Sequence, residues 1–525
     1  MARTKQAKAE QSTTPAQQLG SIVKSTRDIM RKDKGLNGDL DRLPMLTWIM
    51  FLKFLDDLER VQEEVALLEG KLYRPLIAVP YRWRDWGADS KTLTGPDLIA
   101  FINQDEAVRP DGKRGVGLFT YLRNLQSADG KGRQEIVANI FRGITNRMES
   151  GYLLREAIDK INSINFASTE EVHTLSRFYE SMLREMRDAA GDSGEFYTPR
   201  PVVQFMVAAM APQLGETVLD PACGTGGFLV EAHNYLAEQV KTTEDRDALQ
   251  WMTLYGQEAK SLPYLLAQMN LLLHGLEHPQ IAYGNSLTVT LTELGLKDRV
   301  DVILSNPPFG GEEETSVREG FPKDLQTSET ALLFLQLIMR LLKRPEQSQG
   351  KAGRAAVVVP NGVLFGDGVC ARIKEQMLKN FNLHTVVRLP NGVFAPYTSI
   401  PTNLLFFDRT GSTKEVWFYE QPMPEGRKNY TKTKPIQFEE FGDCLTWWHD
   451  RQENDRAWKV PVSDILKYEG DTLLSANLDI KNPNGAEDFT HKSPEELVAD
   501  IWQKEQRILD ILGEIKNFLL TQEHE

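Results

Sequence analysis

Val218-Leu219-Asp220-Pro221-Ala222-Cys223-Gly224-Thr225-Gly226-Gly227-Phe228-Leu229 is the stretch that decides the fold of this 525-residue chain. A short apolar run ends at an acid, a glycine-rich turn follows, and Phe228 begins an apolar run of helical character. This order predicts a strand, a tight turn and a helix, the first βα unit of an open α/β sheet. The glycines let the backbone approach a ligand, and Asp220 would lie at the strand's carboxyl end, where such sheets bind ligands. A purely structural turn is the alternative, because short glycine motifs also occur by chance.

A second apolar run, from Asp301 to Leu304, leads into Ser305-Asn306-Pro307-Pro308-Phe309. The two prolines fix φ and donate no N–H, so the Pro307 carbonyl would be an acceptor on a rigid frame. The Asn306 side-chain oxygen is a second acceptor, and Phe309 adds a flat ring. Two acceptors and a stacking ring suit an exocyclic amine on a flat heterocycle. A proline-terminated strand with a core phenylalanine is the alternative.

Together, DPACGTGG at 220–227 and NPPF at 306–309 resemble the DNA methyltransferases that modify amino groups with S-adenosylmethionine. Three further features narrow the resemblance to the modification (M) subunit of type I restriction–modification systems. They are the chain length, a helical N-terminal region, and the segment Gly194-Glu195-Phe196-Tyr197-Thr198-Pro199-Arg200-Pro201. The resemblance covers most of the chain and is strongest from Gly194 to Phe394.

The resemblance implies an adenine-N6 DNA methyltransferase that protects host DNA from restriction, with S-adenosylmethionine as methyl donor and no metal. The implied fold is α/β and Rossmann-like, a mainly parallel seven-stranded sheet whose last strand is antiparallel. The implied partners are double-stranded DNA, a specificity (S) subunit that chooses the sequence, a second M subunit and restriction (R) subunits. The implied catalytic residues are Asn306, Pro307, Pro308 and Phe309, acting on an adenine flipped out of the duplex. The residues expected to bind the cofactor are Glu195, Phe196, Tyr197, Thr198, Pro199, Arg200, Asp220, Gly224, Thr225, Gly226, Gly227, Glu258 and Asn285.

Glu258 and Asn285 follow the next two expected strands. An acid at the end of the second strand accepts hydrogen bonds from ribose hydroxyls, although Glu258 lies farther from the glycine turn than the usual ~20 residues. We interpret the polar segment 241–247 as an extended helix or loop, which accounts for the additional residues between the glycine turn and Glu258. The resemblance assigns Asn285 to the adenine of the cofactor, with a surface turn as the alternative. The charged segment 311–324 is interpreted as a mobile loop over the active site.

Composition excludes several other classes of protein. An apolar content of 41% and a charged content of 26% are typical of a soluble globular chain. Cys223, Cys370 and Cys444 form no C-x-x-C pair, which favours a reducing cytoplasm and no zinc site. His274 and His278 are interpreted as structural, because metal sites need three or four ligands. No signal peptide and no apolar run of roughly 18 residues is found, so we expect a cytoplasmic protein and no membrane.

The net charge of −13 is unfavourable for a chain that binds DNA alone, because affinity for the DNA backbone comes from Lys and Arg. Either basic groups cluster locally, or a partner supplies much of the DNA contact. The basic segment from Leu19 to Lys34 is one candidate for phosphate contact, with a solvated helix face as the alternative. Residues 408–484 contain no repeat, finger or basic helix, so we expect another polypeptide to recognise the target sequence.

The expected domains are a disordered tail at 1–18, an α-helical domain at 19–170, a catalytic domain with a C-terminal extension at 171–484, and a C-terminal helix at 485–525. Within the helical domain we expect a buried helix that begins at Pro44, and shorter helices near 117–125 and 133–141. A capping box at Ser493-Pro494-Glu495-Glu496 begins the last helix, whose apolar seam suits a partner subunit. Packing on its own core is the alternative.

Two other functions are weighed. A glutamine-N5 protein methyltransferase also uses an Asn-Pro-Pro-aromatic turn, but the helical N-terminal region and the segment at 194–201 disfavour it. A non-catalytic DNA-binding scaffold would not need Asp220, Glu258 and Asn306 together. We expect direct methyl transfer without a covalent nucleophile. Cys223 lies in the cofactor turn and is not near a Pro-Cys motif of the kind that attacks a base.

Overall fold

The structure is a computed structural model that describes residues 15–89, 91–126, 133–166, 198–276, 278–347, 350–395, 398, 400–431, 433–484, 502, 504–509 and 511–513. Met1–Ile480 form one compact unit and Lys481–Glu525 a second. Several predictions lie outside the described residues. They concern most of the N-terminal tail, the domain boundary near 170, the residues Glu195, Phe196 and Tyr197, the capping box at Ser493 and most of the C-terminal helix.

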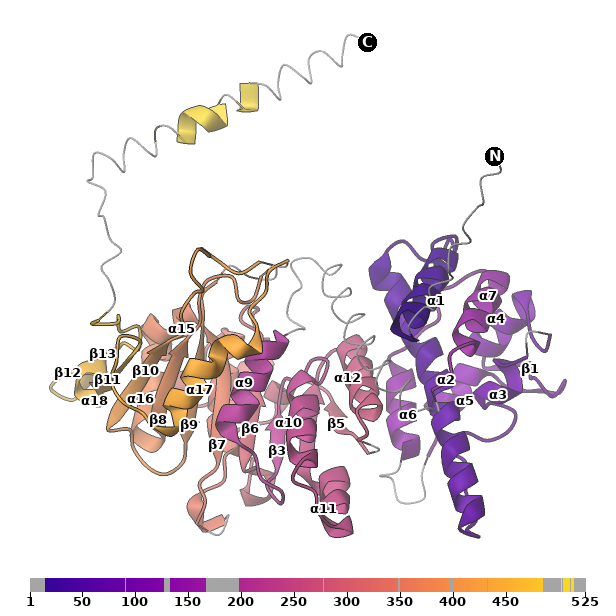
Figure 1. Ribbon diagram of the computed structural model, residues 1–525, viewed down its shortest axis with the longest axis horizontal. Helices are drawn as coiled ribbons and strands as arrows, with labels where there is room; N and C mark the ends of the chain where they lie inside the picture. Colours follow the sequence, from indigo (N-terminus) through magenta and orange to yellow (C-terminus); the bar gives the residue numbers. More distant parts are fainter. Residues whose placement is uncertain are drawn as a thin grey trace, which may run out of the picture. The chain divides into compact units, whose positions relative to one another are not determined.

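Nine strands form the central sheet of the described chain (Figure 1). Across the sheet their order is β11-β10-β8-β9-β7-β6-β3-β4-β5. Their bounds are β3 Val218–Asp220, β4 Leu254–Glu258, β5 Gln280–Tyr283, β6 Val302–Ser305, β7 Arg354–Pro360, β8 Asn382–Arg388, β9 Thr402–Asp408, β10 Glu415–Glu420 and β11 Ala457–Pro461.

Strands β3 to β9 are the seven strands that the resemblance implied. β5, β4, β3, β6 and β7 pair in parallel, and β9 runs antiparallel between β7 and β8. The fold class is therefore confirmed. The sequence did not predict β10, which pairs in parallel with β8, or β11, which pairs antiparallel with β10. Val416 and Phe418 of β10 are buried in the core, which explains why the sheet extends past β8.

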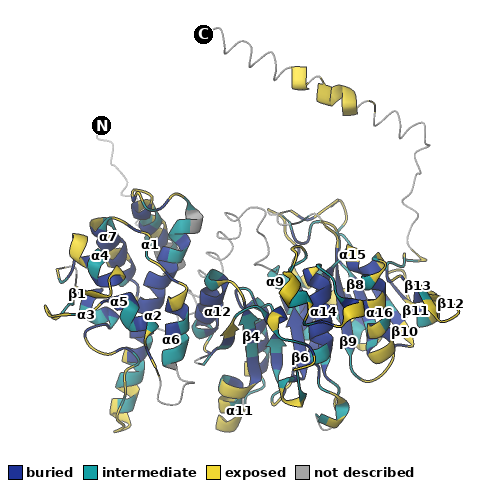
Figure 2. Cartoon of the chain, turned by 180° about the vertical axis from the view of Figure 1, so that it is seen from behind, coloured by how far each residue is buried: buried dark blue, intermediate teal, exposed yellow. Residues whose placement is uncertain are grey.

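Alternate residues of each strand face two apolar cores, one on each side of the sheet. In β9, Leu404 and Phe406 belong to one core, and Leu405 and Phe407 to the other. Because successive side chains point to opposite faces, both faces must be covered. On the first face lie α9 Arg200–Met210, α10 Gly227–Ala237 and α12 Ser261–Leu273, and on the second α14 Thr330–Leu341 and α16 Val369–Asn380 (Figure 2).

Shorter elements connect these layers. The segment expected to extend the connection before β4 forms α11 Thr243–Ala248 and the π-helical turn η2 Leu249–Thr253. The others are the 3-10 helix η3 Ser286–Thr288, the helices α13 Thr315–Arg318, α15 Asn361–Phe365, α17 Gly442–His449 and α18 Val462–Ile465, and the hairpin β12 Leu466–Glu469 with β13 Thr472–Ala476.

The N-terminal part is mostly helical and shares an apolar core with the first face of the sheet. Its helix α2 begins at Asp39, five residues before the expected start, so Pro44 lies inside it. The residues after Pro44 are almost all buried, and their burial outweighs the hydrogen bond that proline removes. The elements are α1 Pro15–Met30, α2 Asp39–Leu68, α3 Trp83–Trp86, α4 Gly95–Asn103, β1 Glu106–Val108, β2 Arg114–Val116, α5 Leu118–Arg123, α6 Arg133–Arg142 and α7 Gly151–Asn162.

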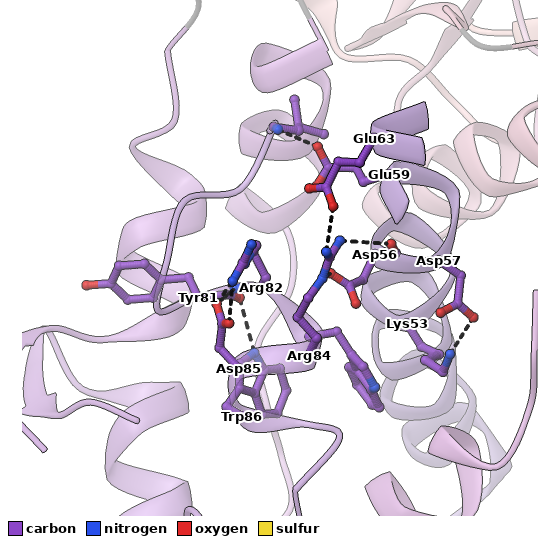
Figure 3. Close-up of polar contacts among 12 residues, drawn as sticks. Lys53, Asp56, Asp57, Glu59, Glu63, Tyr81, Arg82, Arg84, Asp85 and Trp86 are labelled. Carbon is purple, nitrogen blue, oxygen red and sulfur yellow. Dashed lines mark hydrogen bonds and ion pairs between the residues drawn. The ribbon is translucent and has the colours of Figure 1, made fainter. Parts of the chain in front are cut away.

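Charged side chains of α2 and α3 form the α2 charge cluster of Lys53, Asp56, Asp57, Glu63 and Arg84, in which each acid contacts a cation (Figure 3). Arg84 donates to Asp56 at 2.8 Å and to Glu63 at 2.7 Å. Lys53 pairs with Asp57 one turn along the helix. Arg84 belongs to α3, so these contacts fix α3 against α2. Each acid of the cluster has a cationic partner, as buried carboxylates require.

Candidate active site

The ends of four parallel strands meet at one cavity of about 240 Å³. Carboxyl ends of parallel strands share one edge of a sheet, which is where open α/β sheets bind ligands. The lining residues come from the segments after β3 (Pro221, Ala222, Gly224), β5 (Gly284, Asn285, Ser286) and β6 (Asn306, Pro308, Gly310, Gly311, Glu312, Glu313), from the end of β4 and the residues after it (Gln257, Glu258, Ala259, Lys260), and from α14 (Thr330, Phe334).

The glycine turn is tied to the end of β4 by Glu258. Gly224 and Gly226 have φ of +54° and +78°, which side chains rarely adopt. The Gly224 N–H donates to Glu258 Oε2 at 3.0 Å, and the Lys260 N–H donates to Oε1 at 2.7 Å. Burial raises the pKa of Glu258. Each carboxylate oxygen keeps a second lone pair, so Glu258 can also accept hydrogen bonds from a ligand.

Asp220 is buried behind the turn and joins β3 to β6. Its Oδ1 accepts from the Ser305 hydroxyl at 2.7 Å and from the Ala222 N–H at 3.1 Å. Both donors are neutral, so burial, with the nearby charge of Glu258, raises the pKa of Asp220 to about 7. Asp220 is absent from the lining of the cavity among the described residues, and its observed contacts support the turn.

Within the described residues, only one end of the Asn306 amide makes a hydrogen bond. Its Nδ2 donates to the Thr198 hydroxyl at 3.0 Å, whereas its Oδ1 is buried and accepts no hydrogen bond from the described residues. An unsatisfied buried acceptor costs about 1–3 kcal/mol. Because Thr198 occupies the nitrogen, the amide is oriented with its oxygen free. Thr198 was expected at the cofactor, and its observed contact is with Asn306 instead.

The rest of the NPPF turn divides between the cavity and the core. Pro308 lines the cavity, whereas Pro307 is buried and, with Phe309, is not among the lining residues that the structure describes. The Phe309 ring is half-buried and packs edge-on against Phe394, with 5.9 Å between ring centroids. One part of the Phe309 ring therefore stays accessible.

Asn285 joins the end of β5 to the acidic loop that follows β6. Its Oδ1 accepts from the Leu287 N–H at 2.9 Å, which caps η3, and its Nδ2 donates to Glu313 at 3.2 Å. Glu312 and Glu313 belong to the segment interpreted as a loop over the site. Sequence reasoning missed them as lining residues, and also Lys260, although their charge next to a motif was an available signal.

Other expected cofactor residues have structural contacts. Arg200, the first residue of α9, pairs with Glu231 of α10 at 2.8 Å. The Thr225 carbonyl accepts from Asn270 Nδ2 at 2.9 Å. Pro199 precedes α9, and Gly226 and Gly227 begin α10, where a Cβ on Gly226 would lie 3.4 Å from Ala267. The predicted cofactor contacts of these residues stay predictions.

The described residues contain no group of three or more His, Cys, Asp or Glu side chains that could hold a metal ion. His274 contacts the Asn270 carbonyl at 2.7 Å, and the His278 ring stacks on Trp251. Among the helices of the described part, none is long and apolar enough to cross a membrane.

Comparisons with known proteins agree with this geometry. The family model for N-6 DNA methylases matches residues 170–491. The methylase subunit of the type I restriction enzyme EcoEI from Escherichia coli is 45% identical over 95% of this chain and 97% of its own length. The EcoKI methylase subunit from E. coli K12 is 31% identical over 71% of this chain.

Solved structures give the same result. A crystal structure from Vibrio vulnificus YJ016, assigned as a type I modification subunit, has 66% identity and a TM-score of 0.84, covering 91% of this chain and 99% of that one. A chain from a study of the assembly of a type I restriction–modification system has 38% identity and a TM-score of 0.73, covering 97% and 99%. This chain therefore belongs to the N-6 DNA methylase family, among the methylase subunits of type I restriction enzymes.

Proposed function

We propose that this modification subunit transfers a methyl group from S-adenosylmethionine to adenine N6 in double-stranded DNA, at a sequence chosen by a specificity subunit. The modification would protect host DNA in the cytoplasm from restriction. One observation carries the assignment at residue level. The glycine turn, Glu258 and Asn306 line the same cavity, and the Asn306 Oδ1 has no donor among the described residues.

The residues of the cavity fit S-adenosylmethionine. Glu258 offers free lone pairs for ribose hydroxyls, and the turn at Gly224 has no side chain to block a ligand. Glu258, Glu312 and Glu313 outnumber Lys260 along the wall, so the cavity favours a cation. When bound, S-adenosylmethionine supplies an electrophilic methyl group on a positively charged sulfur.

The acceptor side of the cavity suits an amino group. An amine conjugated to a ring is a poor nucleophile, and adenine must leave the duplex to reach the site. The Asn306 Oδ1 and the Pro307 carbonyl would each accept one N6 hydrogen, which raises the electron density on nitrogen and directs its lone pair. As the bond between N6 and the methyl carbon forms, the bond from that carbon to sulfur would break, the sulfur would leave as a neutral thioether, and the N6 proton would pass to solvent. Phe309 would stack on the base. Orientation and fixed dipoles supply the rate, with no covalent intermediate.

The proposed complex also includes a second M subunit and restriction subunits. Support comes from the names of the relatives and from the net charge of −13, which leaves much of the DNA contact to a partner. We propose the C-terminal segment 485–525 as a docking helix for the specificity subunit. We keep the domain limits of 19–170 and 171–484 as proposals.

The proposed function is tested by identifying the molecule that accepts the methyl group. The chain is co-expressed with its specificity subunit and incubated with labelled S-adenosylmethionine and either duplex DNA or a glutamine-bearing protein. We expect N6-methyladenine, identified by mass spectrometry of the DNA digest. Label only in protein glutamine would overturn the assignment. Tight, site-specific DNA binding by the isolated chain would contradict the proposal that the specificity subunit recognises the target sequence.

A further inference from the structure

Four arginines gather at the amino ends of the parallel strands, the end opposite the candidate active site. Arg299 precedes β6, whereas Asn306 follows it, and four strand residues at ~3.3 Å each separate the two edges by roughly 13 Å. Arg340 and Arg344 lie at the end of α14 and just after it. Arg409 follows β9, whose last residue pairs with the first residue of β7. We call these four residues the arginine cluster.

The arginine cluster borders a cavity of about 580 Å³ that is separate from the active-site cavity. Arg340, Arg344 and Arg409 line it, together with the apolar side chains of Leu325, Met339 and Phe381. Sites for small molecules have volumes of about 300–1,000 Å³, with apolar walls and a few polar groups. This cavity therefore has the size and the mixed lining of a ligand site.

Structural contacts use only part of the hydrogen-bonding capacity of the arginines. Arg340 donates to the carbonyls of Leu291 at 3.0 Å and Leu294 at 2.9 Å, and Arg409 donates to the carbonyl of Leu342 at 2.8 Å. A guanidinium has five N–H donors, so most remain available.

The side chains of the other two arginines make fewer hydrogen bonds to the described protein. Arg299 is 7% exposed and donates to Gln347 at 3.0 Å, but its Nε is buried and has no acceptor in the described part of the chain. The exposed Arg344 side chain makes no hydrogen bond within the described residues. None of the four is in an ion pair with an acid of the described chain. Four positive charges therefore gather here without an ion pair among the described residues, and one of them, Arg299, is buried.

Mutual repulsion is visible in the acid–base behaviour of the arginine cluster. Burial, and then the charges of Arg299, Arg344 and Arg340, lower the pKa of Arg409 to about 10. Burial and two of the same neighbours lower the pKa of Arg299. Glu346, which also lines the cavity, is the one acid that acts on Arg409 in the opposite direction. A bound anion would relieve this repulsion.

We propose that the arginine cluster binds a small ligand that carries two or more phosphoryl groups, such as an inorganic oligophosphate or the polyphosphate chain of a nucleotide. Guanidinium groups match phosphate oxygens in bidentate geometry, and three of them face one cavity. A hollow with apolar walls favours a small ligand over a DNA duplex, which binds along an extended basic surface.

The test is calorimetric titration of the full-length chain with inorganic tripolyphosphate and, separately, with ATP. Arg344→Glu is the informative variant, because this exposed side chain makes no hydrogen bond or ion pair among the described residues. Arg114→Glu, an equally exposed arginine on the β1–β2 hairpin, is the matched control with the same change in charge.

We expect Arg344→Glu to weaken binding at least about tenfold relative to Arg114→Glu, because hydrogen bonds to charged groups are lost. Binding of both compounds would assign recognition to the phosphates, and binding of ATP alone would add its base and sugar; either result supports the site. Binding of neither compound, or a difference between the variants below tenfold, would overturn it. Methylation is not the readout, so the result is independent of the proposed function.

Discussion

The α2 charge cluster and the active-site cavity treat buried polar groups in opposite ways. In the α2 charge cluster, Arg84 bridges Asp56 and Glu63, and Lys53 pairs with Asp57, so each charge contacts one of opposite sign. At the cavity, Asp220 has only neutral donors, and the Asn306 Oδ1 has no donor among the described residues. Matched charges fix one helix to another. Unmatched buried groups lower stability, which is how the two regions can be told apart by experiment.

The largest expected effect concerns the pH dependence of Asp220. A pKa raised from 3.8 to about 7 changes the free energy of unfolding by roughly 4 kcal/mol over this pH range. Between about pH 4 and pH 7 the native state holds a proton that the unfolded chain has released, so stability falls as pH rises through this window and is level above it. Asp220→Asn should remove this slope, and it should be more stable than the unmodified chain at pH 8 without ligand. Urea unfolding at pH 5 and pH 8 gives the free energy of unfolding of each protein at each pH. An equal change in this free energy between the two pH values in both proteins would contradict the prediction.

Next in size is the loss of a matched charge. Arg84→Ala should lower the free energy of unfolding by about 3 kcal/mol, because it leaves two acids of the α2 charge cluster unpaired. Breaking a buried ion pair costs about 3–5 kcal/mol, and the lower value applies because the Arg84 side chain is 25% exposed. The control is Arg456→Ala, whose ion pair with Asp443 is 45% and 78% exposed and should contribute less than about 1 kcal/mol. If both variants lose the same stability, the α2 charge cluster is not the structural element described above.

A smaller effect is expected for Glu258. Glu258→Gln should weaken binding of S-adenosylmethionine by about 30-fold, or roughly 2 kcal/mol, because a carboxylate accepts stronger hydrogen bonds than an amide. Glu244→Gln on α11 is the control, since that side chain is exposed and outside the cavity. Calorimetry with the cofactor gives both affinities. Unchanged affinity in Glu258→Gln would remove Glu258 from the cofactor site.

The smallest effect is predicted at Thr198, a positioning residue. Thr198→Val should lower kcat for methylation about tenfold, roughly 1.4 kcal/mol, because the Asn306 amide loses the acceptor that orients it. Cofactor affinity should not change, and Thr198→Ser should restore the rate. Loss of cofactor affinity with an unchanged kcat would instead support the role in cofactor binding that the sequence predicted.

The fold could be predicted because its signals are local. Apolar runs that end in an acid, an amide or a proline mark the strand ends of β3, β4 and β6, and parallel strands place those ends at one edge. β10 and β11 were missed because short strands in a charged segment carry little periodicity. The position of Pro44 inside α2 depends on burial by other helices, which no local pattern contains.

The site was predicted less completely, for a related reason. Residue types at strand ends indicated Gly224, Glu258, Asn285, Asn306 and Pro308, which line one cavity. The contact between Thr198 and Asn306 joins residues 108 positions apart, and the sequence offers no signal for it. Arg200 carries a charge next to a motif, and its pairing with Glu231 became visible only in three dimensions.

The central claim is that the free acceptor of Asn306 acts on the amino group while the glycine turn and Glu258 bind the cofactor. One variant, Asn306→Ala, separates these roles when methyl incorporation into duplex DNA and calorimetric binding of S-adenosylmethionine are measured on the same preparation. We predict a loss of methylation by a factor of about 100 to 1,000 with cofactor affinity unchanged within about twofold. Retained methylation, or a loss of cofactor affinity that accounts for the whole effect, would contradict the claim.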